Sequence, residues 1–412
     1  MNLSSFIAKR IAFNRQQSFS RFIIRLSIAA TVISVAVMII TLSFVNGFQE
    51  TVSQKVFSFS GHVRVQARQP MKANIAEDIP IEASDAVAQS IRELPQVTAV
   101  NPFATKYAIL KTISEMEGVL LKGFGSQPSF KHLEQFLLPG GRMPQINDSS
   151  YSREIVLSEY TARQLQLKLN DRIFIYFVRP DGSMRPDRLQ VVGIYKTSIE
   201  EYDKTFALGD LKLIQRLNGW EPYEIGGYEI FLTDYNQMDA VSNEIYASDL
   251  FPQLWETRTV QEILPYIFDW LHIQNTNQFI LITIMIIIAL INLITCLIIL
   301  VLERLRMVGI LKALGASNWA VQKIFLYHAA YITLTGIVLG TVLALGLLWL
   351  QMETGFVRLK EEAYYMQTAV VVIKWEQVAA VGICTLLVSV LVLLIPSFLI
   401  RSIQPVKAIR FR

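Results

Sequence analysis

Long apolar runs interrupt this chain of 412 residues at four places, which are residues 26–46, 279–302, 324–350 and 378–400. A membrane-spanning helix needs about 20 mostly apolar residues to cross a hydrocarbon core of about 30 Å. Each run has this length and almost no charge. Buried core helices of a soluble protein are the alternative, but they are seldom so long. The pattern therefore predicts four transmembrane helices.

Residues 47–276, between the first and second runs, show the shorter periods of a folded domain. Alternating apolar and polar positions predict strands at 62–67, 106–113, 172–178 and 189–195. Helical patterns occupy 83–94, 158–169, 210–217 and 238–248, with Ser158 and Asp210 as N-caps. About 230 residues are enough for an independent core. We expect a large α+β domain of two subdomains, with the helical pattern at 259–274 as a stiff connection to the second run.

Basic residues gather in three of the segments that flank the runs. They are Lys9, Arg10, Arg15, Arg21 and Arg25 in the predicted amphipathic helix 1–25, Arg304, Arg306, Lys312 and Lys323 between the second and third runs, and Arg401, Lys407, Arg410 and Arg412 after the fourth. Lys and Arg stay on the cytoplasmic side of a membrane. Both termini are therefore predicted to be cytoplasmic, with residues 47–276 outside.

The same bias accounts for the net charge of +4, so nucleic acid is not needed as a partner. The first run could be read as a cleavable signal peptide. Its length, and the lack of a small-x-small site before Asn46, favour an uncut anchor instead.

The sequence offers no catalytic constellation. The histidines His62, His132, His272 and His328 are scattered without metal-binding spacing, and both cysteines, Cys296 and Cys384, fall inside apolar runs. The charge cluster from Glu200 to Lys204 could suggest acid–base chemistry, but such a run is more often a solvated loop. A phosphate-binding G-x-x-x-x-G-K-[ST] loop is absent. We expect no enzyme activity, no metal and no cofactor in this chain.

Residues 303–316 form a short basic segment between the second and third runs. Leu305, Val308, Leu311 and Leu314 recur at helical spacing, with Arg304 and Lys312 elsewhere. Gly315 stands where a helix ends, and Ser317 where the next one begins. The segment is therefore predicted to be a separate short helix at the cytoplasmic face. It either rests on lipid headgroups or serves as a lever for a soluble motor, and we favour the lever.

Two features of the runs predict helix contacts inside the membrane. Gly336, Gly340 and Ala344 recur every four residues, which lets another helix approach closely. Asn292 and Thr295 are polar groups in mid-run and should face protein or a cavity rather than lipid.

Several motifs along the whole chain resemble one family. They are FIAKR at 6–10, VNGF at 45–48, VVGIY at 191–195, EEYD at 200–203, GILKALGAS at 309–317, YYM at 364–366, and Pro396 with the basic tail from Arg401 to Arg410. Together with the order of helix, large domain and three helices, they resemble the FtsX/MacB-type ABC permeases. Within these, the chain is most similar to the LolC/LolE lipoprotein-releasing permeases.

This resemblance implies a permease of the bacterial inner membrane. Residues 47–276 would be a MacB-like periplasmic domain and 277–412 an FtsX-like permease domain. A separate cytoplasmic ABC ATPase, similar to LolD, would bind ATP and Mg²⁺ and dock on the helix 303–316 through Arg304, Arg306, Val308, Leu311, Lys312, Leu314 and Gly315. The other implied partners are a second permease chain, identical or different, membrane lipid, a lipoprotein substrate and a periplasmic carrier similar to LolA.

The resemblance also implies a cavity for the acyl chains of the lipoprotein. Its expected lining is Val37, Ile40, Phe44 and Phe48, facing Phe279, Ile282, Met285 and Ile286. Each of these residues could equally serve plain helix packing. The hairpin 179–188, with Arg179, Asp181, Arg185 and Arg188, is placed where the LolC branch has a hook that captures the carrier. It is shorter than such a hook, so a plain surface hairpin remains the alternative.

Two other functions stay open. A division-type FtsX regulator would pull on a cell-wall hydrolase, although that branch has a much smaller external domain. A MacB-like efflux permease would carry a fused ATPase or recruit an exit duct, and no fused ATPase is expected here. The choice between the LolC and LolE branches also stays open.

Overall fold

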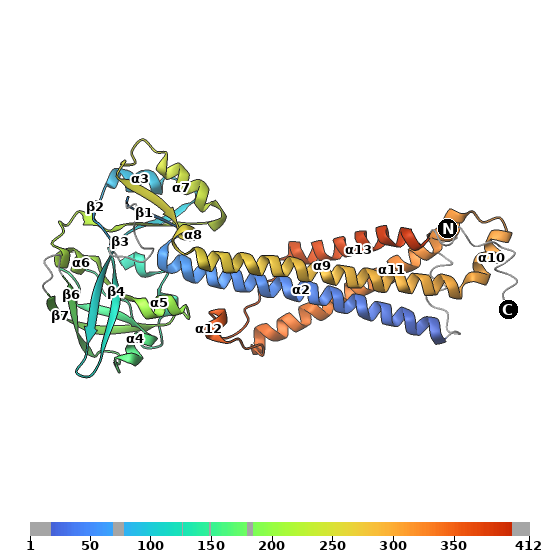
Figure 1. Ribbon diagram of the computed structural model, residues 1–412, viewed down its shortest axis with the longest axis horizontal. Coiled ribbons are helices and arrows are strands. Elements are labelled where there is room, and N and C mark those ends of the chain that lie inside the picture. The colour runs from blue at the N-terminus through green and yellow to red at the C-terminus, as the bar shows by residue number, and fades with distance from the viewer. Residues whose placement is uncertain (1–17, 69–77, 126, 148–149, 179–183, 398–412) are drawn as a thin grey trace. The chain divides into compact units, whose positions relative to one another are not determined.

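The computed structural model describes residues 18–68, 78–125, 127–147, 150–178 and 184–397. The chain divides into two compact units. The helical unit consists of the described parts of Met1–Gln49, Leu271–Arg358 and Thr368–Arg412. The strand-rich unit consists of those of Glu50–Trp270 and Leu359–Gln367. Figure 1 labels the elements of both.

The strand-rich unit contains most of the chain's described elements. Its strands are β1 (Val63–Ala67), β2 (Ile81–Glu82), β3 (Val97–Lys111), β4 (Met116–Phe124), β5 (Glu154–Ser158), β6 (Arg172–Val178), β7 (Met184–Tyr195), β8 (Phe206–Asp210), β9 (Glu224–Ile225), β10 (Gly227–Leu232) and β11 (Trp255–Thr259). Its helices are α3 (Asp85–Arg92), α4 (Glu159–Gln164), α5 (Glu200–Thr205), α6 (Leu211–Asn218), α7 (Met238–Tyr246), α8 (Val260–Ile263) and α12 (Glu361–Tyr364), with short 3₁₀ turns at Gln127–Phe130, Glu134–Phe136 and Tyr235–Gln237.

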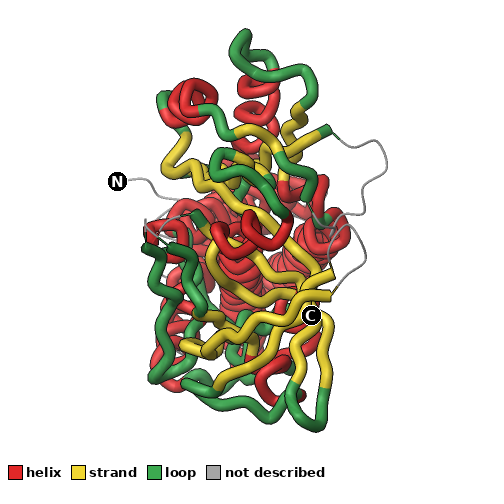
Figure 2. The backbone as a smooth tube through the Cα atoms, turned by 90° about the vertical axis from the view of Figure 1, so that its left-hand side faces the viewer, coloured by secondary structure: helices red, strands yellow, loops and turns green. Residues whose placement is uncertain are grey.

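Among the described residues, the strands form one nine-stranded sheet and one two-stranded sheet. The order in the large sheet is β11-β1-β10-β3-β4-β8-β5-β7-β6, and β3 pairs with β6 as well. That extra pairing joins Ala108–Lys111 to Phe174–Phe177 and closes six of the strands into a barrel. Figure 2 shows these strands in yellow. Closure removes sheet edges and encloses a core of aliphatic and aromatic side chains.

The four predicted strands are present as β1, β3, β6 and β7, and the four predicted helices as α3, α4, α6 and α7, whereas the other seven described strands and α5 were not predicted. The length of β3 was underestimated. The strand runs through Pro102 to Lys111, and it pairs with β10 in its first half and with β4 in its second. Ser158 and Asp210 are N-caps, as expected, and accept hydrogen bonds from Thr161 N and Lys212 N. The prediction of one continuous helix over 259–274 was wrong. Leu264 has non-helical torsions before Pro265, so α8 ends there and α9 begins.

A buried charge network holds the last turn of α2 (Ser18–Ser60) inside this unit. Lys122 on β4 is 1% exposed, and its Nζ donates to the carbonyl of Phe59 and to Glu229. Burial lowers the pKa of Lys122 to about 8, while Glu229 acts in the opposite direction. Arg64 forms a second ion pair with Glu229 at 2.9 Å. The unpaired carbonyls of a helix end need such donors when they are buried.

The helical unit contains the apolar helices. Three of the helices described here are long and apolar enough to cross a membrane, which are α2, α9 (Pro265–Glu303) and α11 (Asn318–Thr354). The short α10 (Leu305–Ala313) lies between α9 and α11 in the chain. The fourth predicted span corresponds to α13 (Trp375–Ser397), of which Trp375–Leu391 counts as a shorter apolar helix.

Small residues bring α11 and α2 into close contact, as the sequence predicted. A Cβ atom on Gly336 would lie 2.7 Å from the side chain of Thr31, and one on Gly340 would lie 2.8 Å from the carbonyl oxygen of Val32. Asn292 of α9 also contacts α2, where its Nδ2 donates to the carbonyl of Ser27 at 3.2 Å. Thr295 instead donates to the carbonyl of Ile291 on its own helix.

The VNGF segment, residues 45–48 of α2, packs closely against the chain that follows α11. A Cβ atom on Gly47 would lie 2.1 Å from the carbonyl oxygen of Val370, which is far too close. The side chain of Asn46 donates to Gln377 at 2.6 Å, and Val372 N donates to the carbonyl of Ser43. The chain after α11 is thus packed directly on the backbone of α2.

Candidate functional site

The segment 303–316, predicted to be a separate short helix, contains α10, a nine-residue helix with defined ends. Gly315 has φ +89°, in the left-handed region. Gly315 N donates to the carbonyl of Lys312, and Ala316 N to that of Leu311. This is the hydrogen-bond pattern of a Schellman motif, which glycine favours because it lacks a Cβ. Ser317 then caps α11 by accepting from Ala320 N at 3.2 Å.

One face of α10 is packed into the helical unit. Val308 is fully buried among residues of α9 and α11, including Leu297, Val301 and Phe325. Met307 and Leu311 pack against the same cluster, and so do Ile23 and Ile24 of α2. Because three long helices meet on this face, α10 cannot shift without moving their ends.

The opposite face of α10 is exposed and differs in part from the prediction. Leu314 was expected on the same side as Val308 and Leu311, but it is 79% exposed, since the helix has already ended there and the chain turns through Gly315. Ile310 is 52% exposed and Trp319, at the start of α11, is 51% exposed. Arg306 lies on the exposed side as well. We call Arg306, Ile310, Leu314 and Trp319 the α10 outer face.

Sequence reasoning missed Ile310 and Trp319. Their signal was available, because both are large apolar residues within the short basic segment between two long apolar runs. Arg304 and Lys312 lie at the sides of the helix, where both are half-buried.

The residues predicted to line a lipid cavity lie near one another in the helical unit. Ile40 and Phe44 of α2, and Ile282, Met285 and Ile286 of α9, pack against one apolar cluster that includes Val35, Ile39 and Leu348. Phe279 is 72% exposed, and Val37 and Phe48 are half-buried. In the single chain, the five residues of this cluster therefore serve helix packing. Along α9, the exposed residues Ile280, Ile284, Ile287 and Ile291 form an apolar stripe.

The predicted docking hairpin is formed by β6 and β7, whose register ends at Val178 and Met184. Arg179 and Asp181 fall outside the described residues, and the side chain of Arg185 does too. Arg188 lies over the ring of Phe174, with its guanidinium carbon 5.7 Å from the ring centroid. The neighbouring β3–β4 turn exposes Ile113 and Met116. Exposed apolar side chains beside basic ones are typical of a protein-binding surface.

The charge cluster Glu200–Lys204 is α5, and it is mostly structural. Tyr202 is 1% exposed, and Asp203 is 8% exposed. The carboxylate of Asp203 accepts hydrogen bonds from Thr197 N, Thr197 Oγ1 and Ser198 N at 2.8–3.0 Å. Burial raises the pKa of Asp203, and these hydrogen bonds oppose the rise. A carboxylate with this many backbone and hydroxyl donors orders a loop rather than transfers protons.

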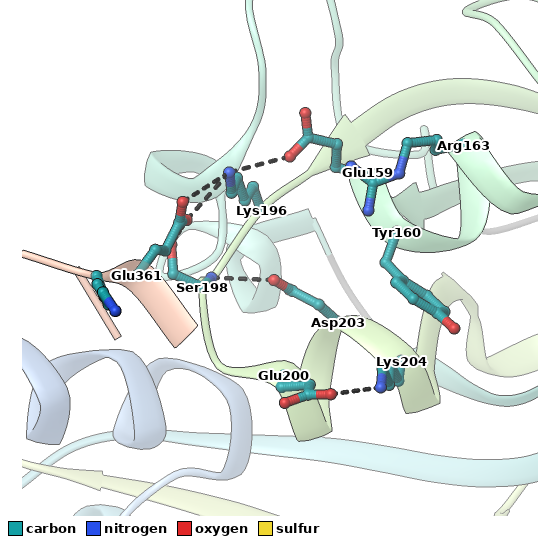
Figure 3. Close-up of a pocket in the computed structure, with 10 residues that line it drawn as sticks. Glu159, Tyr160, Arg163, Lys196, Ser198, Glu200, Asp203, Lys204 and Glu361 are labelled. Atoms are coloured by element: carbon teal, nitrogen blue, oxygen red, sulfur yellow. Dashed lines mark hydrogen bonds and ion pairs between the residues drawn. The ribbon is translucent and has the colours of Figure 1, made fainter. Parts of the chain in front are cut away.

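A pocket of about 750 Å³ lies beside α5 (Figure 3). Charged side chains of both signs line it, and they are Glu159, Arg163, Lys196, Glu200, Asp203, Lys204, Lys360 and Glu361, together with Tyr160 and Ser198. Most of these charges are paired with each other. Lys196 Nζ lies 3.2 Å from Glu159 and 3.0 Å from Glu361, and Lys204 pairs with Glu200. Among the described residues, no group of three His, Cys, Asp or Glu side chains is placed to hold a metal ion.

Comparison with known proteins assigns the chain to a family. A model of the MacB-like periplasmic core domain matches residues 26–247, which is more than half of the chain. The chain belongs to this MacB-like family. A model of the FtsX-like permease C-terminal region matches residues 279–405. This MacB-like chain is therefore a membrane permease of the ABC transporter class with a periplasmic-type domain.

Two curated relatives of this MacB-like permease cover almost its full length. The lipoprotein-releasing system transmembrane protein LolE of Haemophilus influenzae is 24% identical over 99% of this chain and 99% of that protein. LolC of Neisseria meningitidis serogroup B is 22% identical over 96% of each. The resemblance to LolC and LolE permeases is thus confirmed. The periplasmic region of MacB from Actinobacillus actinomycetemcomitans is 13% identical over 50% of this chain and 92% of that chain, at a TM-score of 0.34, which adds nothing to the fold assignment.

The boundary between the two family models and the boundary between the two structural units of this MacB-like permease disagree at residues 359–367. Residues 359–367 lie within the part that the FtsX-like model matches, yet they belong to the strand-rich unit. They are held there by Lys196 and Ser198 through Glu361, and by Lys55, whose Nζ donates to the carbonyl of Tyr365 at 2.7 Å. Residues 359–367 of the loop between α11 and α13 are therefore structurally part of the strand-rich unit.

Proposed function

We propose that this chain is the membrane-spanning permease of an ABC transporter that extracts lipoproteins destined for the outer membrane from the inner membrane. It would hand them to a soluble periplasmic carrier. The observation that carries the proposal is the near full-length similarity to lipoprotein-releasing proteins of both the LolE and LolC types. Four spans, cytoplasmic termini and a periplasmic strand-rich unit complete the proposed topology, on the basis of the charge bias.

Energy would come from a separate ATPase that binds ATP and Mg²⁺ and docks on the α10 outer face. Apolar Ile310, Leu314 and Trp319 with the basic Arg306 supply the mixture of burial and charge that protein interfaces use. Because Val308 on the other face is fully buried, a push on α10 would be passed to α9 and α11.

The lipoprotein acyl chains would enter beside α2 and α9, between two permease chains. Each buried CH₂ contributes about 0.8 kcal/mol, so exposed apolar side chains facing a gap favour acyl chains. The exposed stripe of Ile280, Ile284, Ile287 and Ile291 on α9 supports a second permease chain or lipid at this face. The carrier would dock near the β6–β7 hairpin, around Arg188 and Phe174, with Ile113 and Met116 close in the sheet.

The test is release of a tagged lipoprotein from proteoliposomes that contain this chain, its ATPase and the carrier. ATP-dependent transfer of the lipoprotein to the carrier is expected. Release without ATP, or none with the correct partners, would overturn the proposal and favour a regulator of cell-wall hydrolases or an efflux permease.

The docking part of the proposal has its own test. Arg306→Glu combined with Ile310→Asp should abolish binding of the ATPase and release, while the chain still folds. The matched control is Arg358→Glu, an exposed charge reversal in the loop after α11. Normal ATPase binding by the double variant would show that the motor docks elsewhere.

A further inference from the structure

Three segments of the strand-rich unit continue into the helices of the helical unit. They are the last part of α2 from Glu50 onward, the first turn of α9 up to Trp270, and residues 359–367 between α11 and α13. All three contact one short stretch, the loop 196–199 together with α5, which we call the α5 junction. Figure 1 labels α5.

The end of α2 is held by an aromatic contact. The ring of Tyr202 stacks on that of Phe59 with a centroid distance of 4.7 Å and an interplanar angle of 14°. The hydroxyl groups of Tyr202 and Ser60 lie 3.1 Å apart. Both Tyr202 and Phe59 are 1% exposed, so this contact lies in the core and is well fixed.

The start of α9 is held through Glu201, the residue before Tyr202. The hydroxyl of Tyr266, in the first turn of α9, donates a hydrogen bond to the carboxylate of Glu201. Trp270 is the last residue of α9 that belongs to the strand-rich unit. Its ring packs edge-on against the ring of Tyr365, with a centroid distance of 5.4 Å. The second segment therefore contacts both the α5 junction and the third segment.

The third segment is held through Glu361. Its carboxylate accepts a hydrogen bond from Ser198 Oγ at 2.5 Å and pairs with Lys196 Nζ at 3.0 Å (Figure 3). Burial alone lowers the pKa of Lys196, but hydrogen bonds to Glu361 and Glu159 outweigh it and raise the pKa above its ordinary value. With the pKa of Lys196 raised and that of Glu361 lowered, both partners are charged at neutral pH.

The α5 junction is itself fixed to the sheet. Ser198 has φ +66°, a conformation that costs about 1–2 kcal/mol for a residue other than glycine. It is held there because its N–H donates to Asp203. The hydroxyl of Tyr195 donates to the carbonyls of Tyr202 and Phe206 at 3.1 and 2.8 Å, and Ser158 donates to that of Asp203. The strained loop is thus shaped to present Lys196 and Ser198 to Glu361.

We propose that the α5 junction consists of positioning residues that bind the three segments to one another, so that a displacement of any one of them is passed to the other two and to the sheet. This inference rests on the proposed function, because it assigns to these residues the transmission of ATP-driven movement to the periplasmic side. In this proposal, the EEYD stretch acts with its flanking loop as a mechanical joint rather than as a binding site.

The first test measures the joint without any transport assay. Glu361→Lys places two cations against each other at the Lys196 contact. In the full-length chain in nanodiscs, amide hydrogen exchange of residues 359–367 should become about tenfold faster, which corresponds to about 1.4 kcal/mol. The matched control is Glu353→Lys, the same change on the exposed last turn of α11, which should leave this exchange unchanged.

A second substitution at position 196, which restores an ion pair with position 361, makes the first test specific to this pair. Lys196→Glu combined with Glu361→Lys rebuilds the pair with reversed charges, and Glu159→Gln is added to both variants because Glu159 lies 3.2 Å from Lys196 and would repel a carboxylate there. The exchanged pair should bring the exchange back toward the rate of Glu159→Gln alone. Unchanged exchange in Glu361→Lys, or no restoration in the exchanged pair, would overturn the proposed joint.

The second test measures coupling as lipoprotein released per ATP hydrolysed in proteoliposomes. Glu361→Lys should keep ATP hydrolysis and lower this ratio several-fold, and the exchanged pair should restore it. A faster amide exchange with an unchanged ratio would show that the joint transmits nothing, which overturns the proposal. If the wild-type chain itself releases no lipoprotein, the proposed function fails, and the exchange measurements still decide whether the joint exists.

Discussion

Two short helices, α10 and α5, each contact several longer parts of this chain, but they are held in opposite ways. The nine residues of α10 are anchored by buried apolar side chains and by backbone hydrogen bonds at the Schellman turn. The six residues of α5 and the loop before it are anchored by a stacked tyrosine, a buried carboxylate and an ion pair.

The apolar anchor of α10 and the polar anchor of α5 resist different kinds of displacement. A packed apolar contact resists compression, because protein interiors are already close-packed, but it has little directional preference. Hydrogen bonds and ion pairs depend on distance and angle, so they resist separation and twisting. We therefore expect α10 to tolerate polar changes on its outer face and to fail when its apolar anchor is lost. The α5 junction should respond to small changes in hydrogen bonding.

The largest expected effect concerns the anchor of α10. Val308→Asp buries a carboxylate without a partner and should cost at least about 4 kcal/mol of folding free energy. Ile310→Asp makes the same chemical change on the exposed face and should cost less than about 0.5 kcal/mol. Thermal unfolding of the purified chain in mild detergent, followed by size-exclusion chromatography, measures both. Equal unfolding temperatures for the two variants would show that α10 is not anchored through Val308.

The anchor of α5 gives the next effect. Tyr202→Ala removes a buried ring that stacks on Phe59 and should lower the stability of the strand-rich unit by about 3 kcal/mol. Tyr202→Phe keeps the ring and loses only the contact with Ser60, so about 1 kcal/mol is expected. The same unfolding measurement applies. A Phe variant as unstable as the Ala variant would mean that the hydroxyl contact, rather than stacking, holds the end of α2.

A smaller effect is expected at the end of α10. Gly315→Ala puts a Cβ at φ +89° and should cost about 1 kcal/mol, although the space around it is open. Gly346, inside α11, also has open space but ordinary helical torsions, so Gly346→Ala should be neutral or slightly stabilising. If both variants behave alike in thermal unfolding, the left-handed turn contributes nothing to the boundary of α10.

The smallest effect is a pH dependence at the α5 junction. Burial alone raises the pKa of Glu361, but hydrogen bonds from Ser198, Lys196 and Gln367 outweigh it and leave the pKa below the ordinary value of 4.5. A carboxylate of this kind stabilises the folded state above that value and loses the contribution as the pH falls through its folded-state pKa.

Amide exchange of residues 359–367, corrected for intrinsic rates, should therefore be constant near neutral pH and accelerate only below about pH 4.5. The expected change is less than about 1 kcal/mol, because the pair is partly exposed. Glu361→Gln should remove this acceleration. An equal acceleration in that variant would assign the pH dependence to another group.

The structures of the two helices also differ in how well the sequence predicts them. For α10 the signals are local: Gly315 ends the helix, Ser317 starts the next, and apolar runs lie on both sides. Strands β1, β3, β6 and β7, the N-caps Ser158 and Asp210, and the close approach at Gly336 and Gly340 were predictable for the same reason, since each depends on neighbours in sequence or on residue size. Leu314 was placed wrongly because a helical period was extended past the last helical residue.

For α5 the decisive contacts are distant in sequence. Tyr202 meets Ser60 across 142 positions, and Ser198 meets Glu361 across 163. No local pattern shows that Glu361, in the loop between α11 and α13, belongs to the strand-rich unit. The buried Lys122 was missed for the same reason, since its partner Glu229 lies 107 positions away. The EEYD stretch was recognised as a charge cluster and as a motif of the family resemblance, but its buried Tyr202 and Asp203, which define its structural role, were not predicted.

Gly47 is required by the packing of α2 against the chain after α11. A side chain at this position would collide with the carbonyl of Val370, so glycine here reports the crossing of two backbones and not the identity of the cargo. A library randomised at position 47 should return glycine under selection for folding alone, even in cells that no longer need transport. Glycine at this position in another chain would thus identify the architecture, and the transported molecule would have to be sought in side chains that face the gap.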